Sequence, residues 1–124
     1  MPRTKVLVVE DDRSLVDVLR YNLEKSGYDV TCSYDGNDGL NQARLKLPDI
    51  ILLDVEMPRM DGYEFAKHIR NDPKTEGLPI IMITSRVSDE HKSRAIELGV
   101  NDYLGKPYQE SALLDAVNHL LNRE

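Results

Sequence analysis

Carboxylate side chains follow two of the apolar segments in this sequence. The segment Ile-Ile-Leu-Leu at 50–53 is followed by Asp54, and Glu56 comes two residues after Asp54. The segment 5–9 is followed by three acids in a row, Glu10, Asp11 and Asp12. Burying an unpaired carboxylate is costly, so an acid at the end of an apolar strand requires a compensating partner or a function. These acids are therefore candidates for a functional site.

A hydroxyl and an amine end two further segments with strand character. The apolar run 80–84 ends at Thr84, and the short segment 101–105 is followed by Lys106. Taken alone, Thr84 would be an ordinary β-branched strand residue and Lys106 a surface lysine. Because both follow strands in the same way as the acids do, a common site is the better interpretation.

Short apolar runs alternate along the chain with segments of helical periodicity. The predicted strands span residues 5–9, 28–33, 49–54, 80–84 and 101–105. The predicted helices are one that carries Leu15, Leu19 and Leu23 and ends at Gly27, then 36–47, 62–71 and 88–99, and a last helix with an apolar stripe over 113–121. This alternation predicts an α/β fold, with a parallel sheet covered on both faces. No repeat or linker is visible, so residues 1–124 are expected to form a single domain.

In an open parallel sheet the carboxyl ends of the strands lie on one rim, where ligands bind at the point at which the strand order reverses. The predicted rim residues are Glu10, Asp11, Asp54, Thr84 and Lys106. Oxygen ligands without His or Cys suit Mg²⁺, or Mn²⁺ as an alternative. With such a cation present, Asp54 could attack phosphorus and form an acyl phosphate. Thr84 and Lys106 would bind the phosphoryl oxygens.

Composition excludes several other classes of protein. The net charge of −6 argues against direct nucleic-acid binding, which requires a basic face. No apolar run approaches the roughly 20 residues of a membrane-spanning helix. Cys32 is the only cysteine, which excludes a disulfide framework and favours a reducing, cytoplasmic location.

Four motifs match a known family in order and spacing: "VLVVEDD", "DIILLDVEMPRMDG", "IIMITS" and "NDYLGKPY". Together they make the chain resemble the receiver domain of two-component response regulators, the CheY-like domains, over nearly its whole length. The resemblance implies a doubly wound, flavodoxin-like (βα)5 fold with five parallel strands in the order 2-1-3-4-5. It also implies that the domain is a signalling receiver, which catalyses only its own phosphorylation and dephosphorylation.

The same resemblance implies roles for individual residues. Asp54 would be the phosphoacceptor, and Mg²⁺ would be held by Glu10, Asp11, Asp54 and the backbone carbonyl of Glu56. Asp12 lies one place beyond the acidic pair and is expected to be a surface residue. Thr84 and Tyr103 would be the switch residues. Lys106 would contact the phosphoryl group, and Pro107 would follow it through a cis bond.

The resemblance further implies partners and a conformational change. The phosphoryl donor would be a phosphohistidine on a histidine kinase or a phosphotransfer domain. Thr84 is expected to move toward the phosphoryl group, and Tyr103 to rotate inward into the vacated space. The face formed by helix 88–99, strand 101–105 and the last helix would then bind a downstream effector or a second receiver.

Two charged residues are candidates for control of the phosphoryl lifetime. Glu56 lies two places after Asp54, and Arg86 two places after Thr84. We expect both at the mouth of the site, where they could pair over the phosphoryl group and hinder the hydrolytic water. Two independent solvated side chains are the alternative.

A different class of function also fits part of the pattern. Haloacid dehalogenase-type phosphatases use a strand-end Asp, a second acid two residues on, a Ser or Thr, and a Lys. In that family the second acid is Asp, whereas here it is Glu56. Further metal-binding acids follow the lysine in that family, whereas here Lys106 is followed by "PYQES". No segment is large enough for a cap over a substrate, so the receiver is favoured.

The sequence leaves the protein context open. "LRYNLEKSGYDV" resembles receivers of transcription factors, whereas "MITSRVSDEHKSRAIELGVNDYLGKPYQE" resembles receivers fused to CheA-type hybrid kinases. The chain is expected to be either a stand-alone receiver or a domain of a longer protein, and an engineered or mixed sequence is a further alternative.

Overall fold

Five strands and five helices alternate along the chain in the computed structural model, which describes residues 3–122. The elements are β1 (Lys5–Val9), α1 (Arg13–Lys25), β2 (Asp29–Ser33), α2 (Gly36–Lys46), β3 (Ile50–Leu53), α3 (Gly62–Arg70), β4 (Ile80–Thr84), α4 (Asp89–Glu97), β5 (Asp102–Gly105) and α5 (Glu110–Asn122). Every predicted element is present, with ends that differ by up to two residues. None of the helices within residues 3–122 is long and apolar enough to cross a membrane.

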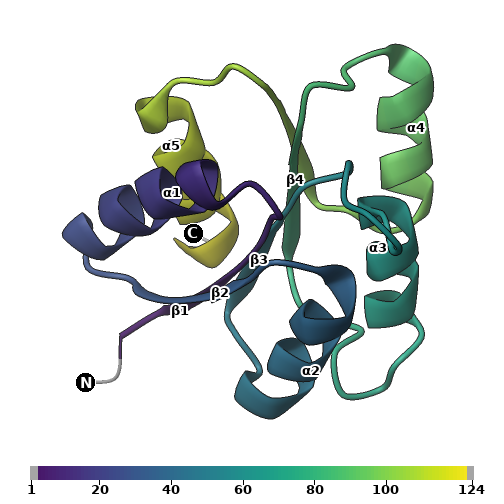
Figure 1. Ribbon diagram of the computed structural model, residues 1–124, viewed down its shortest axis with the longest axis horizontal. Helices are drawn as coiled ribbons and strands as arrows, with labels where there is room; N and C mark the ends of the chain where they lie inside the picture. Colours follow the sequence, from purple (N-terminus) through teal and green to yellow (C-terminus); the bar gives the residue numbers. More distant parts are fainter. Residues whose placement is uncertain (1–2, 123–124) are drawn as a thin grey trace.

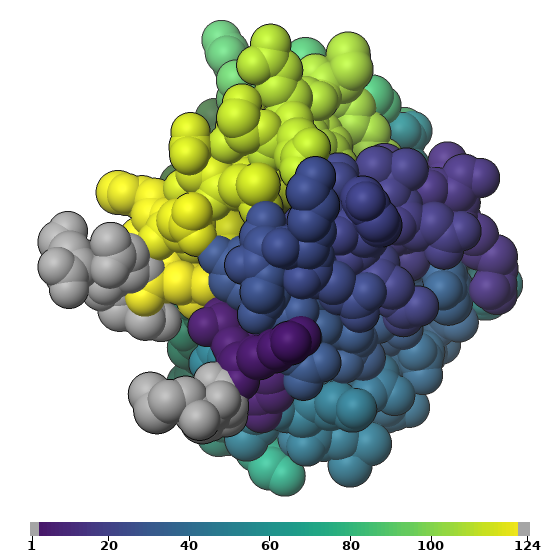
Figure 2. Space-filling model, turned by 90° about the vertical axis from the view of Figure 1, so that its left-hand side faces the viewer, coloured from purple at the N-terminus to yellow at the C-terminus, as the bar shows by residue number. Residues whose placement is uncertain are grey.

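The strands form one parallel sheet in the order β2-β1-β3-β4-β5. Helices α1 and α5 cover one face of the sheet, and α2, α3 and α4 cover the other (Figure 1). Helices α1 and α5 also lie side by side at the surface (Figure 2). The predicted doubly wound (βα)5 fold is confirmed, and the strand order reverses at β1, which lies between β2 and β3.

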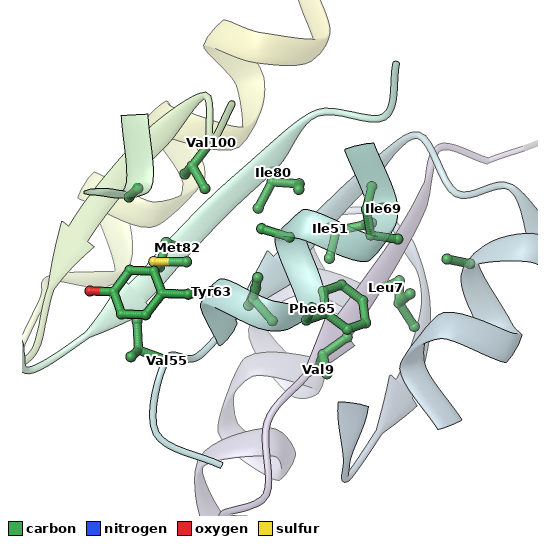
Figure 3. Packing of buried hydrophobic residues seen from close by; sticks show 14 of the residues in the cluster. Leu7, Val9, Ile51, Val55, Tyr63, Phe65, Ile69, Ile80, Met82 and Val100 are labelled. Atoms are coloured by element: carbon green, nitrogen blue, oxygen red, sulfur yellow. The ribbon is translucent and has the colours of Figure 1, made fainter. Parts of the chain in front are cut away.

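Each face of the sheet has its own apolar core. The core under α2, α3 and α4 contains Phe65, whose side chain is fully buried, and Figure 3 shows residues of β1, β3 and β4 in the same cluster. The core under α1 and α5 contains Val16, Leu19 and Leu23 of α1. Sequence periodicity predicted Leu15 in this stripe; Leu15 is only partly buried, and Val16 takes the fully buried position.

Four of the helices begin with a capping side chain. Asp12, Asp35, Asp61 and Ser88 accept hydrogen bonds from main-chain N–H groups in the first turns of α1, α2, α3 and α4. These bonds satisfy N–H groups that have no partner within the helix. Since the helices start near the carboxyl ends of the strands, the rim contains two kinds of acid: capping residues and residues free to form a site.

Candidate functional site

Four strands place chemically active side chains on the same rim. Glu10 follows β1, Asp54 follows β3, Thr84 ends β4, and Lys106 follows β5. Main-chain hydrogen bonds extend the strand ladder into these positions, from Asp54 N to Val9 O at 3.1 Å and from Lys106 N to Thr84 O at 2.8 Å. The rim residues are thus held at a fixed spacing by the sheet itself.

Three carboxylates converge at this rim. Oxygen atoms of Glu10, Asp11 and Asp54 all lie within 4.8 Å of one another. Glu10 and Asp54 are 3% and 5% exposed, whereas Asp11 is exposed. Asp12 caps α1 with its side chain, as expected of a residue outside the acidic pair, and its main-chain N–H donates to Glu10 Oε2 at 3.1 Å.

Lys106 is the cation of the cluster. Its Nζ lies 3.2 Å from Glu10 Oε1 and 3.4 Å from Asp54 Oδ1. Burial lowers the pKa of Lys106, but the carboxylates of Asp54 and Glu10 outweigh that effect and raise its pKa overall. Lys106 therefore remains an ammonium ion. The peptide bond between Lys106 and Pro107 is cis.

One lysine does not compensate two buried carboxylates. Burial, and then repulsion from Asp54, raise the pKa of Glu10 to about 7. The pKa of Asp54 is also raised, by burial, although Lys106 acts against this shift. In the ionised state the site therefore has an excess of negative charge and a set of oxygen donors without His or Cys. These properties fit a hard divalent cation such as Mg²⁺ or Mn²⁺.

Thr84 and Tyr103 lie on neighbouring strands and both contact Arg86. Thr84 is fully buried, and its Oγ1 accepts a hydrogen bond of 3.2 Å from Arg86 N. Tyr103 donates its hydroxyl hydrogen to Arg86 O, and its ring packs partly buried against the Phe65 core. The rotation of Tyr103 into space vacated by Thr84 on phosphorylation stays a prediction. In this structure the Tyr103 ring is partly buried and its hydroxyl has a main-chain acceptor.

Glu56 and Arg86 form an ion pair at the edge of the site, with Arg86 Nη2 2.9 Å from Glu56 Oε2. The two side chains are 51% and 48% exposed. Ser85 donates from Oγ to Glu56 Oε1 at 3.2 Å. Spacing along the chain does not reveal this hydrogen bond, because it depends on the rotamer of Ser85.

Gly62 is a residue near the site that sequence reasoning did not single out. Its N–H donates to Val55 O at 2.8 Å, which closes the loop between β3 and α3. A Cβ atom at this position would lie 2.4 Å from the main-chain oxygen of Asp54. Only glycine allows the start of α3 to approach the main chain of Asp54 this closely. The Asp-Gly pair at the start of α3 was the available signal.

Comparison with known proteins gives one family. The family model of the response regulator receiver domain matches residues 6–118. Chemotaxis protein CheY4 of Vibrio cholerae is 33% identical, with a TM-score of 0.92 over 97% of this chain and 100% of that one. The receiver domain of a Francisella response regulator is 32% identical, with a TM-score of 0.90 over 97% and 98%.

A third similar structure comes from a different type of protein. The signal receiver domain of a signal transduction histidine kinase from Syntrophus aciditrophicus is 30% identical, with a TM-score of 0.89 over 97% of this chain and 91% of that one. The similar structures thus include receivers from response regulators and from a kinase. The phosphatase hypothesis has no support among these findings. The chain belongs to the response regulator receiver family, and it is a signalling module of two-component systems.

Proposed function

We propose that Asp54 is the phosphoacceptor of this receiver and that residues 1–124 act as one phosphorylatable domain in the cytoplasm. The observation that carries the proposal is the position of Asp54, a buried carboxylate 3.4 Å from Lys106 and grouped with Glu10 and Asp11. An isolated strand-end aspartate would not need three charged neighbours supplied by two other strands.

Each of these side chains has a role in the proposed reaction. An oxygen of Asp54 forms a bond to phosphorus while the bond from phosphorus to the donor imidazole nitrogen breaks, and the imidazole takes up a proton. Lys106 binds one phosphoryl oxygen by charge, and the Thr84 hydroxyl donates to another. Glu10, Asp11, Asp54 and the backbone carbonyl of Glu56 would hold Mg²⁺, which when bound offsets the repulsion between Asp54 and the incoming phosphoryl group.

The proposed output depends on the residues around Arg86. A phosphoryl group brings a charge of about −2 and three acceptor oxygens. The Thr84 hydroxyl would leave Arg86 N for one of these oxygens, and Tyr103 would rotate inward into the vacated space. The face formed by α4, β5 and α5 would then favour a downstream effector or a second receiver. The donor would be a histidine kinase or a histidine phosphotransfer domain.

The pair Glu56–Arg86 is proposed to lengthen the phosphoryl lifetime. Glu56 lies two residues after Asp54 and Arg86 two residues after Thr84, and their side chains meet through a 2.9 Å contact. Such a pair narrows the path of the water that attacks phosphorus.

Acetyl phosphate labelling followed by intact-mass measurement tests the phosphoacceptor. The wild-type protein should gain one phosphoryl group with Mg²⁺ and none with a chelator. Asp54→Asn should gain none. Asp12→Asn is the matched control, because asparagine caps a helix as well as aspartate does, and this variant should be labelled like the wild type. Full labelling of Asp54→Asn, or labelling that survives chelation, would contradict the proposal.

A further inference from the structure

Arg86 makes three separate contacts with three different parts of the site. Its main-chain N–H donates to Thr84 Oγ1 at 3.2 Å, and its main-chain oxygen accepts from the Tyr103 hydroxyl. Its guanidinium pairs with Glu56 at 2.9 Å. One residue in the loop between β4 and α4 therefore connects the hydroxyl of the proposed switch, the aromatic ring on β5 and the ion pair at the mouth of the site.

The contact from Tyr103 acts on the main chain of Arg86 and has a stable donor. Burial, followed by the influence of Tyr63, raises the pKa of Tyr103. The hydroxyl therefore stays protonated at neutral pH and keeps a hydrogen to donate. The ring itself packs against the core under α3 and α4, so its position is set by tertiary packing.

The contact from Glu56 is the weaker one. About half of each side chain in the pair is exposed, and exposed ion pairs are held only loosely. Glu56 and Arg86 also line an open groove of about 480 Å³, together with His91 and Arg94. The Arg86 side chain has room to leave Glu56. The fraction of molecules in which this ion pair is formed therefore depends on where the main chain places Arg86.

We propose that the Tyr103 hydroxyl is a positioning group for the Glu56–Arg86 pair, so that the orientation of Tyr103 sets the lifetime of the phosphoryl group. This inference rests on the proposed function of Asp54. It also predicts that a partner that holds Tyr103 inward increases the fraction of molecules in which the ion pair is formed. The reason is that Tyr103 and the ion pair both involve the loop that carries Arg86.

The experiment compares wild type, Tyr103→Phe, Arg86→Ala and the double variant, with Tyr21→Phe as control. Phenylalanine keeps the ring and removes only the hydroxyl, and Tyr21 lies exposed on α1 away from the rim. Loss of one hydrogen bond should speed dephosphorylation roughly threefold in Tyr103→Phe. The same change should have no further effect once Arg86 is alanine, and Tyr21→Phe should match the wild type.

A second measurement does not depend on phosphorylation. The Nε–H signal of Arg86 reports the mobility of its side chain in the unmodified protein, and Tyr103→Phe should make it more mobile while Tyr21→Phe does not. An Arg86 signal that is unchanged in Tyr103→Phe overturns the inference. So does a Tyr103→Phe substitution that changes the dephosphorylation rate equally with and without the Arg86 side chain. Failure of wild-type labelling would instead count against the proposed function, and the Arg86 signal would still test the positioning role.

Discussion

Glu10 should make the metal-free protein less stable as the pH rises. A pKa raised from the ordinary 4.5 to about 7 means that the native state holds this proton over a range in which the unfolded chain has lost it. Stability falls with pH wherever the native state binds more protons than the unfolded state. The stabilising effect of the bound proton is therefore complete below pH 4.5 and is lost as the pH rises through about 7.

The size of the effect follows from the same pKa. One pKa unit corresponds to about 1.4 kcal/mol, so the shift of Glu10 from 4.5 to about 7 corresponds to at most about 3 to 4 kcal/mol. That is a substantial part of the roughly 5–15 kcal/mol that stabilises a typical domain. A divalent cation reverses the trend because it binds the ionised carboxylates, and at a hundredfold excess over its Kd it adds about 2.7 kcal/mol.

Urea unfolding monitored by circular dichroism measures this effect. Wild type and Glu10→Gln are compared between pH 4.5 and 8 in the presence of a chelator, and again with Mg²⁺. Without metal the wild type should lose stability across this pH range relative to Glu10→Gln, which carries no titrating group at position 10. Mg²⁺ should stabilise the wild type more at pH 8 than at pH 5. A difference between the two proteins that stays constant from pH 4.5 to 8 would refute the reasoning.

Three further predictions concern the loops around the site. Glu56→Asn and Arg86→Ala should each speed dephosphorylation by up to about tenfold, and the double variant should be no faster than the faster single one; additive effects would show that the side chains act separately. Gly62→Ala should destabilise the protein by roughly 1–3 kcal/mol or more, because its Cβ would lie 2.4 Å from a main-chain oxygen. Gly77→Ala is the control, since its Cβ would have no neighbour within 4 Å, and an equal loss in urea midpoint for both would contradict the steric argument. Arg59 adopts a φ of 68°, which is costly for a residue with a side chain. Arg59→Gly should thus raise the unfolding free energy by up to about 1 kcal/mol, and a lowered urea midpoint would show that the Arg59 side chain contributes more than the strain costs.

Local sequence patterns were sufficient to predict the helices and strands and a parallel sheet covered on both faces, whereas the strand order came from the family resemblance. Apolar runs such as 50–53 are unbroken because strands in a covered parallel sheet are buried on both faces. Helical periodicity and terminal glycines marked the helices, and Gly27 and Gly99 indeed adopt positive φ values where α1 and α4 end. The polarity of parallel strands then required Asp54, Thr84 and Lys106 to share a rim, since a parallel sheet brings all strand ends of one direction together.

Tertiary structure alone determined the state of the groups on that rim. The raised pKa of Glu10 comes from burial and from Asp54 on a different strand, and neither is visible in the residues that flank Glu10. The partly buried ring of Tyr103 and the hydrogen bond from Ser85 to Glu56 depend on rotamers selected by neighbours far away in the chain. Sequence periodicity specifies which face of an element is apolar, but distances between side chains and their electrostatic interactions are set only when the elements pack together.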